Sequence, residues 1–318
     1  MDASFREIDG NPLPDRATAG SFTARDGKQI RYGVFGHTAQ PPKGTVVLLH
    51  GRNECIEKCF ETIRDLAARG FGVATFDWRG QGGSDRLLRD PFKGHVDDFS
   101  DYVADLEQFF EEVVLPDCRA PFFVLGHSTG SLVALLAAPQ LTSRVNRMVL
   151  SAPLLGFEGL PFSTQTLQRI AAVLFNLGLG SMYMTGGRRG REPAAFASNV
   201  LTTDHARYQR NTRLYHTYPA LGLGGPTVGW IHAACRAIET VNDPAFLARI
   251  HVPILLVAAG ADQVVSTRAT EAFARRLRSA SLLTIDGARH ELMQEADIYR
   301  EQFLAAFTAF VPGTDRLA

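Results

Sequence analysis

The sequence has no excess charge of either sign, because 33 Lys and Arg side chains balance 33 Asp and Glu side chains. A surface that binds nucleic acid needs surplus cations to neutralise phosphates, so the balance argues against that class of protein. No apolar stretch approaches the roughly 20 residues that a membrane-spanning helix requires. The N-terminal segment is charged throughout and has no apolar core of signal-peptide length, so no targeting segment is expected.

Cysteines are also few, and their spacing is not that of metal ligands. The 4 cysteines include no CxxC pair and no disulfide-like framework. Cys55 and Cys59 share one face of a predicted helix, but no second pair of ligands accompanies them, so we expect two neighbouring thiols rather than a metal site. A reducing cytoplasm is the simplest compartment for such a chain. Dinucleotide-binding, P-loop, HExxH and EF-hand patterns are absent as well, so the sequence gives no signal for these rival chemistries.

What the chain contains is an alternation of short apolar runs and longer helical patterns. Its content, 45% hydrophobic and 21% charged, is that of a globular protein. Runs such as residues 45–50 and 254–259 have the length and composition of strands buried inside a parallel sheet. Residues 21–36 predict an opening antiparallel hairpin with Asp26-Gly27 at its turn. The alternation predicts an α/β fold with a mostly parallel, eight-stranded sheet flanked by helices.

Residues 97–114 show helical periodicity with one apolar face. Acidic side chains mostly fall on the opposite face, where we expect them to be solvated and to take no part in chemistry. These are Asp98, Asp101, Asp105, Glu111 and Glu112.

One long segment interrupts the alternation. Residues 154–246 separate two core strands, and a structureless loop of that length would be exceptional. The segment contains helical stretches, many glycines and several aromatic side chains, so we predict an inserted, mainly helical lid. The other boundaries are then an N-terminal extension at 1–20 and an α/β core formed by 21–153 and 247–318.

The pentapeptide Gly126-His127-Ser128-Thr129-Gly130 matches GxSxG, the pattern of a nucleophile elbow. An apolar strand-like run, FFVL, precedes it, and an apolar helix-like run, SLVALLAA, follows it. This is the strand–turn–helix setting that exposes the serine hydroxyl at the edge of a sheet. We therefore predict that Ser128 is a nucleophile.

A serine hydroxyl needs a base, and the base needs an acid that orients it. Asp262 and His290 each follow an apolar strand, in the chain order Ser, Asp, His that this kind of site uses. Of the nine histidines, His290 alone combines this order with this placement. His127, inside the elbow, is expected to point elsewhere and to pack. Asp286 is a competing acid, but it lies four residues before His290 in the same connection, so we prefer Asp262.

A tetrahedral intermediate also needs two backbone donors. Thr129, immediately after the predicted nucleophile, is expected to supply one amide. The second should come from the loop after the strand at 45–50, where the sequence reads His50-Gly51-Arg52-Asn53. We assign it to the amide of Arg52, with Asn53 as the alternative.

With these residues placed, the sequence resembles the α/β-hydrolase superfamily, and within it the monoglyceride lipase and bacterial lysophospholipase group of serine aminopeptidase-like hydrolases. The resemblance covers about residues 20–312 and rests on HGRNE, DWRGQGGSDR, GHSTG, GADQVV and GARHELMQE. Arg52 departs from the pattern, because monoglyceride lipases usually carry a smaller residue there. The site that the resemblance implies agrees with the one chosen from the residues: Ser128, Asp262, His290, Arg52 and Thr129.

The resemblance implies a serine carboxylic-ester hydrolase that cleaves a monoacyl lipid, either a lysophospholipid or a monoacylglycerol, without a cofactor or metal. Two alternatives stay open: a proline iminopeptidase-like aminopeptidase, and a catalytically silent binding protein on the same fold. An aminopeptidase should place acidic groups in the lid to hold a substrate amine. The acids available there are Glu158, Glu192, Asp204, Glu239 and Asp243.

Three arginines of the lid, Arg188, Arg189 and Arg191, could attract a phosphate headgroup or an anionic membrane surface. The expected partner is thus a small lipid ester, with peripheral contact to the inner membrane surface through the lid and no nucleic acid. The sequence predicts neither the headgroup, nor the acyl-chain length, nor the oligomeric state.

Overall fold

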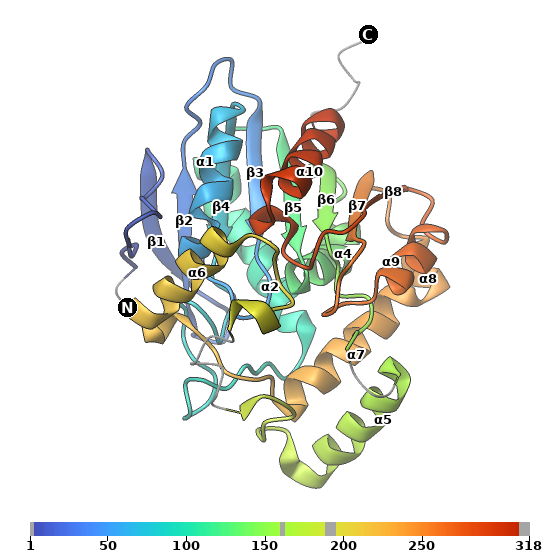
Figure 1. Cartoon of the computed structure of the whole chain (residues 1–318). Helices are drawn as coiled ribbons and strands as arrows, with labels where there is room; N and C mark the ends of the chain where they lie inside the picture. Colours follow the sequence, from blue (N-terminus) through green and yellow to red (C-terminus); the bar gives the residue numbers. More distant parts are fainter. Residues whose placement is uncertain (1–2, 160–162, 188–194, 312–318) are drawn as a thin grey trace.

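The computed structural model describes residues 3–159, 163–187 and 195–311, and an eight-stranded sheet forms its centre (Figure 1). The strands are β1 (Ala17–Thr23), β2 (Gln29–Phe35), β3 (Gly44–Leu49), β4 (Phe71–Phe76), β5 (Phe122–His127), β6 (Val145–Ser151), β7 (Ile254–Ala259) and β8 (Ala280–Ile285). Their order in the sheet is β1-β2-β4-β3-β5-β6-β7-β8. The β1–β2 and β2–β4 pairs are antiparallel and every other pair is parallel, which confirms the predicted sheet.

Helices cover both faces of this sheet, which explains why the central strands are mostly apolar. β3, β5 and β7 are buried at every position. The helices are α1 (Phe60–Ala68), α2 (Phe99–Phe109), α3 (Leu115–Asp117), α4 (Thr129–Leu141), α5 (Thr164–Leu174), α6 (His205–Thr217), α7 (Val228–Asn242), α8 (Pro244–Leu247), α9 (Thr267–Ala274) and α10 (Asp297–Phe310). Side chains of α1 and α10 share one buried cluster, and those of α2, α4 and α7 share another on the opposite face.

The helix expected at 97–114 differs from the prediction in two ways. The α-helix ends at Phe109 and continues as a π-helical turn at Phe110–Val114. Asp105 is not solvated: its side chain is 1% exposed, and its carboxylate accepts hydrogen bonds of 2.7 Å from both Nε and Nη2 of Arg79. Arg79 belongs to the turn after β4, so helical periodicity alone could not reveal this partner.

Residues 152–253 join β6 to β7 and contain α5, α6, α7 and α8. Figure 1 shows α5 and α7 side by side beyond one end of the sheet, and the two helices contact each other. α7 also reaches the core, because Trp230, Ala234 and Val241 belong to the same buried cluster as α2 and α4. Within the residues that the structure describes, no helix is long and apolar enough to cross a membrane.

Candidate active site

Ser128 lies at the sharp turn between β5 and α4. Its backbone has φ 52° and ψ −112°, a conformation that residues with a side chain seldom adopt and that is typical of a nucleophile elbow. Both flanking positions require glycine, because the neighbouring backbone leaves no room for a Cβ atom. A Cβ on Gly130 would lie 2.2 Å from the carbonyl oxygen of Leu49, and one on Gly126 would lie 2.9 Å from Ser131. The GxSxG spacing is therefore dictated by packing against β3 as well as by the turn.

Asp262 and His290 come together at the ends of β7 and β8. His290 Nδ1 donates to Asp262 Oδ2 at 2.8 Å, and both side chains are almost completely buried. The other oxygen of Asp262 accepts from the amides of Val264 and Val265 at 2.8 and 3.0 Å. Burial alone would raise the pKa of Asp262, but the bond to His290 and its charge, together with the two amides, outweigh burial and lower the pKa. Asp262 is thus a carboxylate held in place by three hydrogen bonds, one from the His290 ring and two from backbone amides.

Two further observations concern the arrangement around His290. Asp286, the competing acid, makes no hydrogen bond to His290 in the described part of the chain. Ser128 and His290 line the same cavity, and among the described residues no hydrogen bond joins the hydroxyl to the ring. Catalytic pairs commonly have this looser geometry before a substrate binds.

The loop after β3 presents its amides in a way that favours Arg52 over Asn53 as an oxyanion donor. The amide of Gly51 donates to Glu54 Oε2 at 2.5 Å, and the amide of Asn53 donates to Gln81 Oε1 at 3.1 Å. Both of these amides are therefore occupied. Thr129 is the first residue of α4, where an amide has no acceptor within its own helix. Arg52 and Thr129 both line the cavity that Ser128 lines.

A buried ionic cluster, which sequence analysis missed, ties this loop to the histidine loop. Lys58 Nζ lies 2.7 Å from Glu54 Oε1 and 2.6 Å from Glu291 Oε1, and all three side chains are nearly inaccessible to solvent. Glu54 also holds the amide of Gly51, while Glu291 directly follows His290. Burial alone would lower the pKa of Lys58, but the two carboxylates outweigh it and raise the pKa. The i, i+4 spacing of Glu54 and Lys58 was the available signal, but it gave no hint of Glu291.

The prediction that His127 points away from the site is wrong. It lines the cavity, and its ring centroid lies 4.9 Å from that of His290. Its Nδ1 is buried without a hydrogen-bond partner among the described residues. Burial lowers the pKa of His127 from 6.5 to about 4, with a further contribution from the charge of His290 and an opposing one from Glu54. His127 therefore stays neutral at physiological pH beside His290.

This pKa predicts a pH-dependent stability. Between about pH 6.5 and about pH 4 the unfolded chain binds a proton on His127 that the folded protein excludes, so the free energy of unfolding falls as the pH falls through this window. The loss attributable to His127 is on the order of 3 kcal/mol. Urea unfolding of wild type and His127→Gln across this range should show a shallower decline in the variant. Parallel declines would contradict the prediction.

The cavity has a volume of about 630 Å³, which is within the usual range for small-molecule sites. Its apolar wall comes mostly from the segment between β6 and β7 and from the loop after β7. This wall consists of Leu154, Phe157, Leu167, Met184, Val200, Leu201, Pro226, Trp230, Ile231, Val264 and Val265. A long apolar group can therefore lie next to Ser128.

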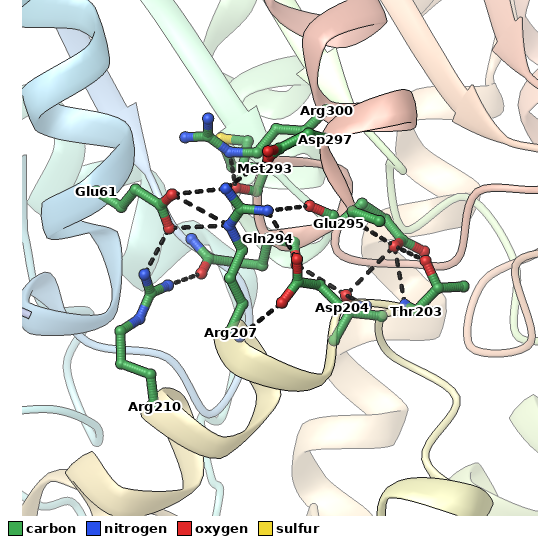
Figure 2. A network of polar contacts seen from close by, with 12 residues as sticks. Glu61, Thr203, Asp204, Arg207, Arg210, Met293, Gln294, Glu295, Asp297 and Arg300 are labelled. Atoms are coloured by element: carbon green, nitrogen blue, oxygen red, sulfur yellow. Dashed lines mark hydrogen bonds and ion pairs between the residues drawn. The ribbon is translucent and has the colours of Figure 1, made fainter. Parts of the chain in front are cut away.

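A polar network joins α6 to the chain just beyond His290 (Figure 2). Arg207 donates to Glu61 on α1 and to Asp297 at 2.8 Å each, and to the carbonyl oxygen of Glu295 at the same distance. The carboxylate of Glu295 in turn accepts from the amide of Thr203 at 2.8 Å and from that of Arg289 at 2.7 Å. The network thus connects three parts of the chain that are distant in sequence.

Loss of Arg207 should weaken this connection. We expect Arg207→Met to lower the free energy of unfolding by about 2 kcal/mol, because several charge-assisted hydrogen bonds disappear together. Hydrogen exchange at the amides of α6 should accelerate as well. Arg213→Met is the matched control, since Arg213 is exposed on the same helix and has no ion pair among the described residues. Equal effects of the two substitutions would show that the network contributes nothing.

The other residues named in the sequence analysis are the charged groups of the segment 154–246 and the two neighbouring cysteines. Arg188, Arg189, Arg191 and Glu192 lie outside the described residues. Asp204 and Asp243 cap α6 and α8, while Glu158 lines the cavity. Cys55 and Cys59 are free and buried. Across the described ranges, no group of three or more His, Cys, Asp or Glu side chains could hold a metal ion.

The sheet order, the elbow after β5 and the strand-end loops define an α/β-hydrolase. The chain belongs to the family described as serine aminopeptidase, S33, which it matches over residues 40–297. These findings confirm the predicted resemblance and identify the protein as a hydrolase.

Individual relatives agree with this assignment. The chain is 33% identical to lysophospholipase L2 of Escherichia coli (strain K12), over 96% of this chain and 92% of that protein. It is 28% identical to mouse (Mus musculus) monoglyceride lipase, over 80% and 77% of the two chains. Among solved structures, a soluble variant of monoglyceride lipase from Saccharomyces cerevisiae has the same fold, with a TM-score of 0.71, 21% identity, and 96% and 97% of the chains covered.

Proposed function

We propose that this protein is a serine carboxylic-ester hydrolase that cleaves a monoacyl lipid through an acyl-enzyme on Ser128. The observation that carries the proposal is the oriented pair of His290 and Asp262, 2.8 Å apart, on the wall of the cavity that Ser128 also lines. The apolar lining suits an acyl chain. The relatives named lysophospholipase and monoglyceride lipase support a lipid with one acyl chain.

The proposed reaction has two halves. In the first, His290 accepts the proton of the Ser128 hydroxyl while the oxygen attacks the ester carbonyl, and the amides of Thr129 and Arg52 stabilise the oxyanion. His290 then gives the proton to the leaving alcohol. In the second half, His290 activates a water molecule, which releases the fatty acid and restores the serine. Asp262 holds the imidazole in the required tautomer throughout and stabilises its cationic form.

Fatty-acid release from matched lysophosphatidylcholine and monoacylglycerol tests the proposal, with Ser128→Ala as the control. Release that depends on Ser128 supports an acyl-enzyme, and the faster substrate shows which headgroup the enzyme prefers. If wild type and variant are equally inert on both lipids, the proposal is wrong. Labelling of wild type by a fluorophosphonate in that case would still mark an active serine hydrolase with another substrate.

An aminopeptidase is the second candidate, and the observation that favours it is Glu158, an exposed acid that lines the cavity. The other two carboxylates that line the cavity, Glu54 and Glu291, are both engaged with Lys58 and are poor receptors for a substrate amine. Release of p-nitroaniline from proline p-nitroanilide would establish this activity. Inertness toward the anilide, the lipids and activated esters alike would favour the silent binding protein.

Peripheral contact with a membrane is part of the proposal, because the substrate is a lipid. Apolar side chains on and just after α5 are turned to solvent in an unusual number for one short segment. These are Ile170, Val173, Leu177 and Met182, which are 38–69% exposed. Such a surface suits insertion into the headgroup region of a bilayer.

A further inference from the structure

Arg52 presents a positive charge without a counter-ion to the cavity beside Ser128. Its Nη1 donates to the carbonyl oxygen of Gly224 at 3.0 Å, and its Cζ lies 5.7 Å from the centroid of the Trp230 ring. No carboxylate of the described chain forms an ion pair with this guanidinium. Burial lowers the pKa of Arg52 from 12.5 to about 10, opposed only by Tyr102, so the group remains charged at neutral pH.

Arg52 is half-buried, and the arginines whose side chains are fully buried differ from it. Each of them is matched by a carboxylate, as expected from the cost of an unpaired charge away from water. The pairs are Arg31 with Glu57, Arg79 with Asp105, and Arg300 with Asp65. Arg52 has no such pair, and neither has Arg86, which is also half-buried and donates to the carbonyl oxygen of Ala220. Of these two, Arg52 lines the cavity.

The position of Arg52 suits contact with a bound substrate. Its two neighbours, Gly224 and Trp230, belong to the segment between β6 and β7, so the guanidinium lies where that segment meets the oxyanion loop. Gly224 occupies one of its five N–H groups, and within the described residues the others have no acceptor. The carboxylates Glu54 and Glu291, which line the same cavity, pair with Lys58 and do not neutralise the charge of Arg52.

We propose that the side chain of Arg52 binds the phosphodiester of the substrate headgroup and makes this enzyme prefer lysophospholipids to monoacylglycerols. The inference rests on the proposed function and assigns to that site a headgroup class. A planar guanidinium matches two phosphate oxygens at once, and a phosphodiester would supply the missing counter-charge. A neutral glycerol headgroup offers no such charge, so its binding would leave Arg52 uncompensated.

Binding of uncleavable lipids tests this directly. The probes are dodecylphosphocholine, 1-O-dodecylglycerol and laurate, each titrated below its micelle concentration into Ser128→Ala and into Ser128→Ala/Arg52→Met. We expect the Kd for dodecylphosphocholine to rise about 10- to 100-fold in the double variant, while the Kd for the neutral ether changes less than about twofold. Arg52→Lys in the same background keeps the charge and should retain most of the phosphocholine affinity.

Three outcomes would overturn the inference. Equal losses for the phosphocholine and the ether would show that Arg52 only supports the cavity wall, and unchanged affinity would show no role. A loss confined to laurate would assign Arg52 to the fatty-acid product.

Hydrolysis provides a second test. The ratio of kcat/KM for lysophosphatidylcholine over monoacylglycerol should fall at least about tenfold in Arg52→Met. This ratio cancels any general damage to the oxyanion loop, because such damage affects both substrates. Inertness of wild type on both lipids would count against the proposed function, while the binding result would still decide the role of Arg52.

Discussion

Ser128→Ala should lower the kcat for fatty-acid release about a million-fold, to the level that binding and oxyanion donors alone provide. The reason is that the proposed reaction passes through a covalent ester on this hydroxyl, and no other side chain occupies the elbow between β5 and α4. Release from lysophosphatidylcholine and monoacylglycerol, followed by mass spectrometry of the fatty acid, measures the effect. A fluorophosphonate should add its mass to the peptide that contains Ser128 in wild type and to no peptide in the variant.

Ser131→Ala is a matched control for this substitution. Ser131 lies on the first turn of α4, is fully buried, and donates to the carbonyl oxygen of Ser151 at 3.3 Å. Its loss perturbs the packing of the elbow and leaves the proposed nucleophile in place, so we expect activity within about tenfold of wild type. If Ser131→Ala is as inactive as Ser128→Ala, the loss reflects damage to the elbow rather than removal of a nucleophile.

Lys58→Met should be the most destabilising single substitution near the site, lowering the free energy of unfolding by about 3–5 kcal/mol. Lys58 is held between Glu54 and Glu291 and pairs with both. Its removal would leave two buried carboxylates facing each other, and they could persist only by taking up protons. Because the two carboxylates outweigh burial and raise the pKa of Lys58, it is charged at neutral pH, so the defect should be present there. Urea unfolding at neutral pH measures it.

Two variants separate the charge effect from a packing defect. Lys28→Met removes a lysine that has no ion pair among the described residues, and we expect it to change stability by less than about 0.5 kcal/mol. The triple substitution Glu54→Gln, Lys58→Met and Glu291→Gln removes the whole charge cluster and should recover part of the stability lost in Lys58→Met. A triple variant less stable than Lys58→Met would show that shape, and not unpaired charge, dominates at this position.

The fold was largely predictable because its signals are local. Apolar runs of strand length marked β3, β5 and β7. The prediction failed where a tertiary partner decides whether a side chain is exposed. Asp105 shows this, because the helical pattern placed it in solvent while Arg79, from another strand end, holds it in the interior.

The candidate site shows the same contrast between local sequence signals and tertiary contacts. By itself the sequence determined which residue types follow which strands: a serine in a GxSxG turn, an aspartate and a histidine in the order of this fold, and a glycine-bearing loop after β3. Such information is carried by spacing along the chain, and the roles proposed for Ser128, Asp262 and His290 rest on it.

Only the tertiary structure decided how these loops are held and what else faces the cavity. It placed His127 against His290, joined Glu54 to Glu291 through Lys58, and left Arg52 without a carboxylate. Hydrogen bonds and ion pairs between segments depend on distances in space, and these distances cannot be read from a single sequence. Burial sets the pKa of His127, the cost of removing Lys58 from between two carboxylates, and the cost of leaving Arg52 unpaired. It exists only once those segments have packed together.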